Sequence, residues 1–121
     1  MRSIGLSLLA LSSVCLAQAV QDFPADATVP SAKEITEHIA GKNFKWRTAG
    51  GDLIRVQFTG RGYIYVDAPR GGQTSGDWRT EDGKLCGTLR GSGAFCNEAR
   101  MSEGVLHLRR TNGEIVRYEP D

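Results

Sequence analysis

The stretch GDWRTEDGKLCGTLRGSGAFCNEAR, residues 76–100, is the part of the chain around which we expect the fold to be organised. It contains two of the three cysteines, and a Gly-Ser-Gly turn signal at 91–93 lies midway between Cys86 and Cys96. If that turn closes a β-hairpin, the cysteines face each other on antiparallel strands, about 4.5–5.5 Å apart at Cα, a separation that a disulfide accepts. We therefore predict a disulfide-bonded hairpin here and not a catalytic motif.

The alternation of side chains along the two strands predicts which face of this hairpin is buried. Pairing Cys86 with Cys96 puts Leu85, Leu89 and Phe95 on one face and the disulfide on the other. We expect the leucine face to lie in the core.

Two turns extend the same pattern toward the C-terminus. Glu103-Gly104 fits a two-residue turn, and residues 111–113 fit a three-residue loop with Gly113 in the left-handed bulge position. Both registers place apolar residues beside apolar ones, which a one-residue slip would not do. The predicted cross-strand pairs are Arg100 with His107, Glu98 with Arg109, Leu108 with Val116, Leu106 with Tyr118, and Arg110 with Glu114.

The chain from residue 43 onward reads as a series of short strands. Apolar and polar residues alternate around 44–47, 53–58 and 63–66, and a further strand runs through Trp78. Turn signals recur about every 8–12 residues, which is typical of an antiparallel meander. We predict a mainly β fold, a single antiparallel sheet of about seven or eight strands, curved or closed as a small barrel. Curvature or closure would remove the exposed edges of such a sheet.

One amphipathic helix is predicted at residues 31–40, packed against the sheet over one open end. Ser31 is suited to cap it, and Glu34 three residues later completes a capping box. Ile35 and Ile39 form its apolar face, whereas His38 lies off that face and is expected to be solvated.

Residues 1–19 have the pattern of an export signal. Arg2 precedes an apolar stretch at 4–16, and Ala-Gln-Ala at 17–19 is a signal-peptidase site. This apolar stretch is shorter than the about 20 residues that a membrane span needs, so we expect no membrane span after the signal is cleaved. The alternative for residues 1–19 is a buried N-terminal helix. Removing 19 of the 121 residues leaves 102, one domain. We predict a linker at 20–30 and a single β-rich domain with its N-terminal helix at 31–121.

The cysteines indicate the compartment. Cleavage of the signal removes Cys15 and leaves Cys86 and Cys96 as an even pair, which favours a disulfide in the periplasm or outside the cell. A metal site is the alternative, but the chain has no Cys-x-x-Cys motif and no histidine at ligand spacing. We expect no metal and no cofactor.

The mature chain is nearly neutral. Without Arg2 it has 14 basic residues against 14 acidic ones, and no run of lysine or arginine alternates with aromatic residues. Nucleic acid and anionic membranes are therefore not expected as partners.

The predicted registers gather one group of charged residues on the outer face of the sheet: Glu98, Arg100, His107, Arg109 and Arg117. This group is the candidate binding face, suited to an anionic group or to an acidic loop of a partner. The alternative is a solvated sheet face whose ion pairs contribute little individually.

No catalytic arrangement is evident in the sequence. Neither histidine has a nucleophile partner, and the glycine-rich pieces lack the strand-to-helix setting of a phosphate loop. Asp77, Glu81 and Asp82 are acidic neighbours, but a glycosidase needs two carboxylates across a cleft. The aromatic residues Trp46, Trp78, Tyr63 and Tyr65 are suited to line a ligand pocket, although in so small a protein we expect them to fill the core.

The order of these motifs resembles a known group of proteins. An export signal, a short Ala-x-Glu-Ile helix within 32–42, Gly-x-Trp at 76–78 and two later cysteines are similar to small exported proteobacterial proteins classed as domains of unknown function. The resemblance covers most of the mature chain and implies a periplasmic or secreted β-rich domain. A weaker similarity, to periplasmic lysozyme inhibitors, rests on their also being small disulfide-bearing barrels. The chain lacks their Ser-Gly and Lys-Tyr inhibitory segment, so no residue is carried over.

The resulting functional hypothesis is an exported, non-enzymatic, monomeric domain that binds a protein or small ligand in the cell envelope. Inhibition of a cell-wall hydrolase such as lysozyme is the alternative. A third hypothesis, an enzyme instead of a binding protein, is a hydrolase that uses the acidic residues.

Overall fold

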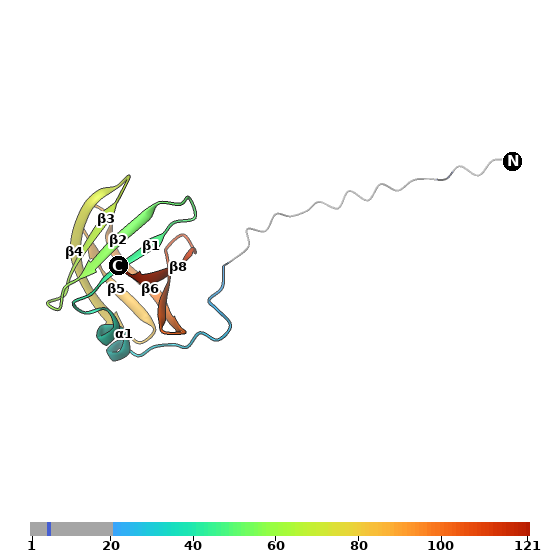
Figure 1. The fold of residues 1–121 in the computed structure, drawn as a ribbon, viewed down its shortest axis with the longest axis horizontal. Helices are drawn as coiled ribbons and strands as arrows, with labels where there is room; N and C mark the ends of the chain where they lie inside the picture. The colour runs from blue at the N-terminus through green and yellow to red at the C-terminus, as the bar shows by residue number, and fades with distance from the viewer. Residues whose placement is uncertain (1–4, 6–20) are drawn as a thin grey trace.

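The computed structural model describes residue 5 and residues 21–121, and in this part of the chain one short helix precedes eight strands (Figure 1). In chain order the elements are α1 (Ala32–Ile39), β1 (Asn43–Arg47), β2 (Leu53–Phe58), β3 (Tyr63–Ala68), β4 (Gly72–Glu81), β5 (Lys84–Leu89), β6 (Gly93–Ser102), β7 (Val105–Arg109) and β8 (Ile115–Pro120). The predicted export signal, residues 1–19, lies outside the described residues except for Gly5. None of the described helical segments has the length and apolar character to cross a membrane.

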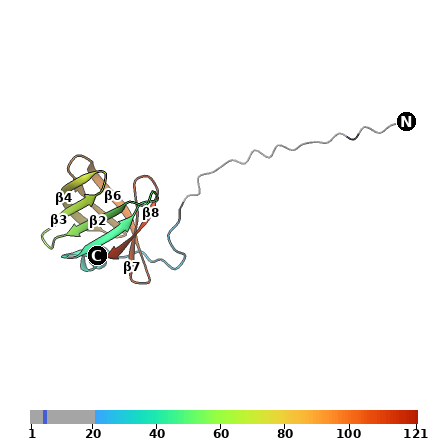
Figure 2. The same ribbon diagram turned by 45° about the horizontal axis from the view of Figure 1, so that its top comes forward.

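The sheet closes on itself. Each strand pairs antiparallel with the next, and β1 also pairs with β8 through Phe44 with Pro120 and Lys45 with Glu119. Figure 2 shows the strands wrapping around a common axis. The prediction of a mainly β meander is therefore confirmed, in its closed form, and closure pairs the first strand with the last.

Strict alternation places one side of every strand in the interior. Along β2, Ile54, Val56 and Phe58 are buried, whereas Arg55 and Gln57 between them are exposed. The inward side chains of the other strands join them in a single core cluster, and on β5 and β7 the outward-facing Cys86 and His107 are buried as well. At one end of the barrel this core is aromatic: the rings of Phe44, Phe58, Trp78 and Tyr118 contact one another at centroid distances of 5.8–6.1 Å.

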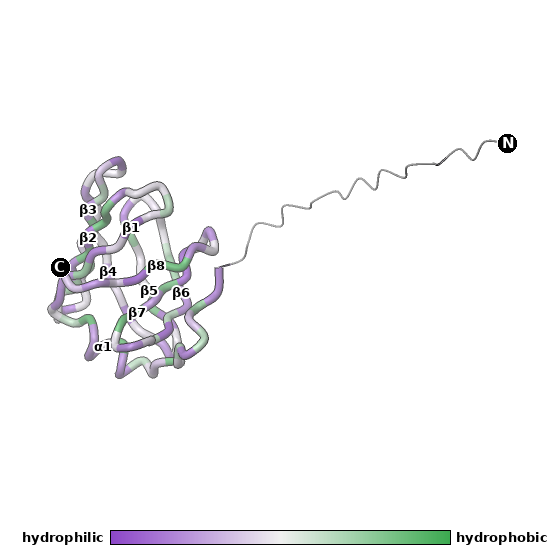
Figure 3. Tube along the Cα trace, turned by 45° about the vertical axis from the view of Figure 1, so that its right-hand side comes forward, coloured by the Kyte–Doolittle hydropathy of each residue, from purple (hydrophilic) through white to green (hydrophobic). Residues whose placement is uncertain are grey.

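Helix α1 lies at this aromatic end of the barrel (Figures 1 and 3). It begins after Ser31, whose Oγ accepts a hydrogen bond from the Glu34 backbone N–H at 3.1 Å, as the capping motif predicts. Ile35 and Ile39 are fully buried in the core cluster. The Asp82 carboxylate, in the β4–β5 turn, accepts from the Ala32 backbone N–H at 2.9 Å and fixes the start of the helix.

The opposite end of the barrel consists of hairpin turns. In an up-and-down meander the β1–β2, β3–β4, β5–β6 and β7–β8 turns all lie at the end away from α1 (Figure 1). We call this end the mouth. It has no helix over it in the described part of the chain.

The predicted hairpin registers are confirmed. Cys86 pairs with Cys96 and the two form a disulfide, with Leu85 in the core. The C-terminal pairs also lie as the turns predicted, with Arg100 opposite His107, Leu108 opposite Val116 and Leu106 opposite Tyr118. The two-residue turn works because Glu103 and Gly104 both adopt positive φ, 51° and 77°.

Residues 21–30 pack on the barrel and are not a free linker. Thr28 and Met101 exchange two backbone hydrogen bonds of 2.8 and 2.9 Å, and the Gly83 N–H donates to the Pro30 carbonyl at 2.8 Å. Figure 3 shows this segment running beside β6 and β7. Because β5 is shorter than β6, the end of β6 has free backbone groups, and the N-terminal segment satisfies them.

The expectation that all four aromatic residues fill the core is wrong for two of them. Trp46 and Trp78 pack against the core, but Tyr63 and Tyr65 are 55 % and 48 % exposed. The physical reason is the two-residue period of β3, which turns Ile64 and the tyrosines to opposite faces.

Candidate functional site

The structure brings the five residues of the candidate binding face together. Arg100, His107 and Arg117 lie side by side on β6, β7 and β8, and Glu98 meets Arg109 at 3.7 Å in the neighbouring row. Arg117 also approaches Glu119 at 3.7 Å. The sequence registers were therefore sufficient to identify this constellation.

This face is nevertheless not an open charged surface. The N-terminal segment crosses it, and Phe23 lies under the guanidinium groups of Arg100 and Arg109, 5.2 and 5.1 Å from their carbon atoms to the ring centroid. His107 is only 5 % exposed and its Nδ1 lies 3.1 Å from the Val105 carbonyl. The arginines thus hold the chain's own N-terminal segment, which leaves mainly Glu98 and Arg117 accessible.

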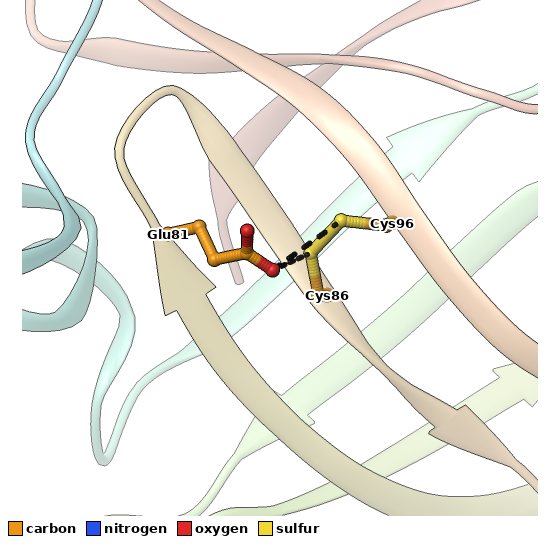
Figure 4. A group of neighbouring side chains, drawn as sticks. All are labelled: Glu81, Cys86 and Cys96. Carbon is orange, nitrogen blue, oxygen red and sulfur yellow. Dashed lines mark hydrogen bonds between the residues drawn. A yellow bond between two sulfur atoms is a disulfide. The ribbon is translucent and has the colours of Figure 1, made fainter.

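The cysteine pair has a carboxylate neighbour. Glu81 Oε2 lies 3.4 Å from Cys86 Sγ and 3.9 Å from Cys96 Sγ (Figure 4). Its carboxylate is also paired with Arg79. Three ligand atoms converge here, but the disulfide consumes both thiolates, and a metal needs deprotonated thiols as ligands. The oxidised pair is a structural cross-link.

The three acidic residues considered for hydrolysis do not form a site. Asp82 caps α1, Glu81 lies at the disulfide, and Asp77 is on the outer face of β4 beside Tyr63. Each of the three therefore faces a different environment. The carboxylate pair that a glycosidase requires is not formed by them.

A hollow in the barrel interior is the feature that the sequence did not reveal. A cavity of about 370 Å³ extends inward from the mouth, and every strand except β4 contributes to its wall. The aromatic end of the core fills the other half of the barrel. The cavity wall is formed largely by apolar side chains, among them Ile54, Val56, Ile64, Val66, Ala68, Leu85, Leu89, Phe95, Leu108 and Val116. We call this space the lumen cavity.

A few polar groups face this apolar wall. Tyr118 lines both the aromatic cluster and the lumen cavity, and burial raises the pKa of its phenol well above the ordinary value of 10.0, against the opposing effect of the Arg110 charge. The hydroxyl is therefore protonated at neutral pH. Among the described residues neither it nor the Asn97 amide has a hydrogen-bond partner, so both are available to a ligand.

Arg110 lies where the lumen cavity meets the mouth. Its guanidinium is 4.8 Å from the centroid of the Trp46 ring and 2.7 Å from Glu114, as the predicted pairing required. Glu114 in turn accepts a hydrogen bond from the Ala49 backbone N–H at 2.7 Å, which ties the β1–β2 turn to the β7–β8 turn. The buried Nε1 of Trp46 has no hydrogen-bond partner among the described residues. The mouth therefore has a preformed shape that is fixed by charge-assisted hydrogen bonds.

The sequence contained a partial signal for the lumen cavity. The inward positions of β2 and β3 that line the cavity are Ile, Val and Ala, whereas Phe44, Phe58 and Trp78 pack together at the α1 end; Trp46 and Phe95 are the aromatic residues of the cavity wall besides Tyr118. Whether such residues meet across a barrel or leave a space depends on its diameter, which the sequence does not give. Comparison with family models, with curated proteins and with solved structures found no match to this chain.

Proposed function

We propose that this protein is exported to the periplasm or secreted, and that its barrel binds a small, mainly apolar ligand in the cell envelope without converting it chemically. The export pattern at 1–19 and the even cysteine pair left after cleavage support the location. The disulfide is compatible with an oxidising compartment.

The lumen cavity is the observation that carries the binding proposal. An eight-stranded barrel has an interior just wide enough to be filled by side chains or to hold one small ligand. Here the α1 end is filled and the mouth end is hollow, with a volume of about 370 Å³. Ligand pockets begin at about 300 Å³ and are mostly apolar with a few convergent polar groups, which matches this wall.

The polar groups suggest where the ligand has its oxygen. A protonated Tyr118 donates a hydrogen bond, and the Arg110 charge lies close enough to act on the same phenol. An apolar molecule with one carbonyl or hydroxyl oxygen would satisfy Tyr118 while its body covers the aliphatic wall. Because Glu114 already neutralises Arg110, we expect no requirement for a fully charged head group.

Binding without conversion is the activity that these residues support best. The lumen cavity is lined by no carboxylate, thiol or histidine among the described residues, so it offers no general base. Inhibition of a cell-wall hydrolase would need a segment shaped to enter the cleft of an enzyme, and no described segment is singled out for that role. We therefore favour ligand binding in the lumen cavity over inhibition of a cell-wall hydrolase.

A Val66→Trp substitution tests the proposal. Val66 lines the lumen cavity, so the indole would occupy the space that the ligand needs. We expect mature wild-type protein to bind the neutral fluorophore N-phenyl-1-naphthylamine saturably and V66W to bind it at least about ten-fold more weakly. Stability should change by less than about 1 kcal/mol, because the added ring enters empty space instead of overpacking a full core.

The neighbouring Asp67 supplies the matched control. Asp67→Trp adds the same ring to the exposed outer face of β3 and should leave fluorophore binding unchanged. Failure of the wild-type protein to bind, or equal binding by V66W, would overturn the proposal. A loss of about 1–3 kcal/mol in V66W would show that the interior is packed and would also overturn it.

The location is tested separately. Expression of the full chain with a C-terminal tag should give a periplasmic or secreted product whose N-terminus is Val20 by mass spectrometry. A cytoplasmic product that still begins at Met1 would contradict export. This outcome is independent of the fluorophore experiment, so the two parts of the proposal fail separately.

A further inference from the structure

The outer face of β3 has two exposed aromatic rings that no packing role explains. Tyr63 and Tyr65 are 55 % and 48 % exposed, while Ile64 between them is 3 % exposed. Two residues along a strand place the rings about 7 Å apart on one face. Exposed tyrosines are characteristic of binding surfaces, because the ring is apolar and the hydroxyl tolerates water.

These rings border a groove of about 420 Å³ on the outer surface of β3, β4 and β5. The strand registers arrange its wall in two rows across the sheet. In the first row Tyr63 is followed by Asp77 and Thr88, and in the second Tyr65 is followed by Ser75 and Arg90. We call this space the tyrosine groove.

Beside the tyrosine groove β4 and β5 approach so closely that two inward-facing positions, Gly76 opposite Ile64 and Gly87 opposite Trp78, have no room for a side chain. A Cβ at Gly76 would collide with the Thr88 carbonyl oxygen, and one at Gly87 would collide with that of Asp77. Glycine at both positions lets the two strands bend sharply together. The tyrosine groove lies on the outer side of this close strand contact, and because paired strands form its wall its shape is preformed.

The polar groups of the tyrosine groove are unpaired. Among the described residues the side chains of Asp77 and Arg90 take part in no ion pair or hydrogen bond, although both strands are otherwise well bonded. One is an acceptor and the other a donor, and their charges cancel. Ser75 and Thr88 add hydroxyl groups between them. A neutral ligand rich in both donors and acceptors matches this wall better than an acidic or basic peptide does.

We propose that the tyrosine groove binds an extended β-1,4-linked glycan. A pyranose ring presents a flat C–H face that packs on a tyrosine ring and an equatorial rim of hydroxyl groups that bonds to polar side chains. Two tyrosines in line on one strand form a linear platform, which fits the ribbon shape of a β-1,4-linked chain. The tyrosine rings lie outside the lumen cavity, whose wall on β3 is formed by Ile64, Val66 and Ala68, although Leu89 lines both spaces.

The groove binds the glycan and does not cleave it. Glycosidases use two carboxyl groups flanking the scissile bond. Asp77 is the only carboxylate among the eight residues that line the tyrosine groove. The acidic residue that the sequence offered for hydrolysis is therefore assigned to hydrogen bonding with a sugar hydroxyl.

NMR titration of the mature protein with two soluble probes tests this proposal. The probes are the β-1,4-linked N-acetylglucosamine tetrasaccharide and cellotetraose. We expect saturable amide shift changes for at least one probe, concentrated at residues 63–65, 75–77 and 88–90. In Tyr63→Ala/Tyr65→Ala the affinity should fall by about ten-fold or more, as is usual when a central aromatic contact is truncated.

Two controls separate stacking from hydrogen bonding and from misfolding. Tyr63→Phe/Tyr65→Phe keeps both rings and should bind within about three-fold of wild type, a difference below about 0.7 kcal/mol. Lys45→Ala, on the outer face of β1, should leave binding unchanged. Unchanged amide spectra away from the groove in each variant show that the barrel is intact.

Three results would overturn the proposal. The first is the absence of saturable binding to both tetrasaccharides. The second is binding whose shift changes lie elsewhere or that the double alanine variant retains. The third is a protein that sediments as a dimer and becomes monomeric in the double alanine variant, because a second copy of the chain would then occupy the groove. V66W should bind the glycan normally, so failure of this proposal is distinguishable from failure of the lumen proposal.

Discussion

Replacing Phe23 by alanine removes the ring that fastens the N-terminal segment to the barrel. The ring is half-buried and lies against Arg100 and Arg109, with the guanidinium carbons 5.2 and 5.1 Å from its centroid. Complete burial of a phenylalanine stabilises a protein by about 1.5–3 kcal/mol, so half-burial contributes about 1 kcal/mol. Each cation–π contact at a partly exposed site adds about 0.5 kcal/mol.

We therefore expect Phe23→Ala to lower the free energy of unfolding by about 1–2 kcal/mol, after allowing for the chain entropy that the loosened segment regains. For a domain of this size that corresponds to a fall in Tm of about 5–15 °C. Thermal unfolding followed by circular dichroism measures it. Amide hydrogen exchange should also accelerate at Thr28 and Met101, whose mutual hydrogen bonds depend on a docked segment.

Two variants show which part of the contact matters. Phe23→Leu keeps most of the apolar burial but loses the cation–π contacts, so its Tm should lie between those of F23A and wild type. Val29→Ala, at a site in the same segment that is 63 % exposed, should change stability by less than about 0.5 kcal/mol. If F23A melts within about 1 °C of wild type and exchange at Met101 is unchanged, the inference that the segment is a fixed part of the domain is refuted.

The remaining predictions concern the cross-link, the helix and the barrel interior. The double variant Cys86→Ala/Cys96→Ala should lose about 2.7 kcal/mol of unfolding free energy by the loop-entropy estimate for a sequence separation of 10. Thiol titration of unreduced, denatured mature protein should find no free cysteine, and a free thiol would contradict the cross-link. Ile39→Ala should lower the free energy of unfolding by urea by about 2–5 kcal/mol, because Ile39 is fully buried. Glu37→Ala on the exposed face of the helix should lower it by less than about 0.5 kcal/mol, and equal losses would contradict the packing of this helix on the core. Because the folded state raises the pKa of Tyr118 above the unfolded value of 10.0, its contribution is present below pH 10 and is lost as the pH rises above it, by at most about 1.4 kcal/mol per pH unit. Tyr118→Phe should remove this slope, and an unchanged slope in urea titrations at pH 9–11 would contradict the buried phenol.

The candidate sites differed in how far the sequence could identify them. The charged outer face was located correctly from two turns, because a two-residue turn and a three-residue bulge loop each permit only one register that keeps apolar pairs together. The sequence did not reveal that this face is partly covered, because the residue that covers it, Phe23, is more than 70 positions away from Arg100 in the chain. The exposure of Tyr63 and Tyr65 could have been predicted from their alternation with Ile64. In a strand either the tyrosines or the isoleucine can face the core, but not both.

Features that depend on near neighbours follow from the amino-acid sequence alone. These are the strands, the hairpin registers, the pairing of Cys86 with Cys96 and the capped helix with its two buried isoleucines. Each follows from a period of side chains or from a turn type that a few consecutive residues impose. Features that depend on contacts between distant segments are visible in the folded barrel and not in the sequence. The N-terminal segment docks through contacts such as that of Gln21 with Ile115, 94 positions apart. Each residue of the segment adds little to the stability of the fold, and the composition of the segment does not indicate that it docks. The lumen cavity is the volume left when the side chains of seven strands meet around one axis, and the tyrosine groove needs residues of β3, β4 and β5 side by side on the outer face of the closed barrel. Volume and curvature are properties of the closed sheet, and no single strand contains them.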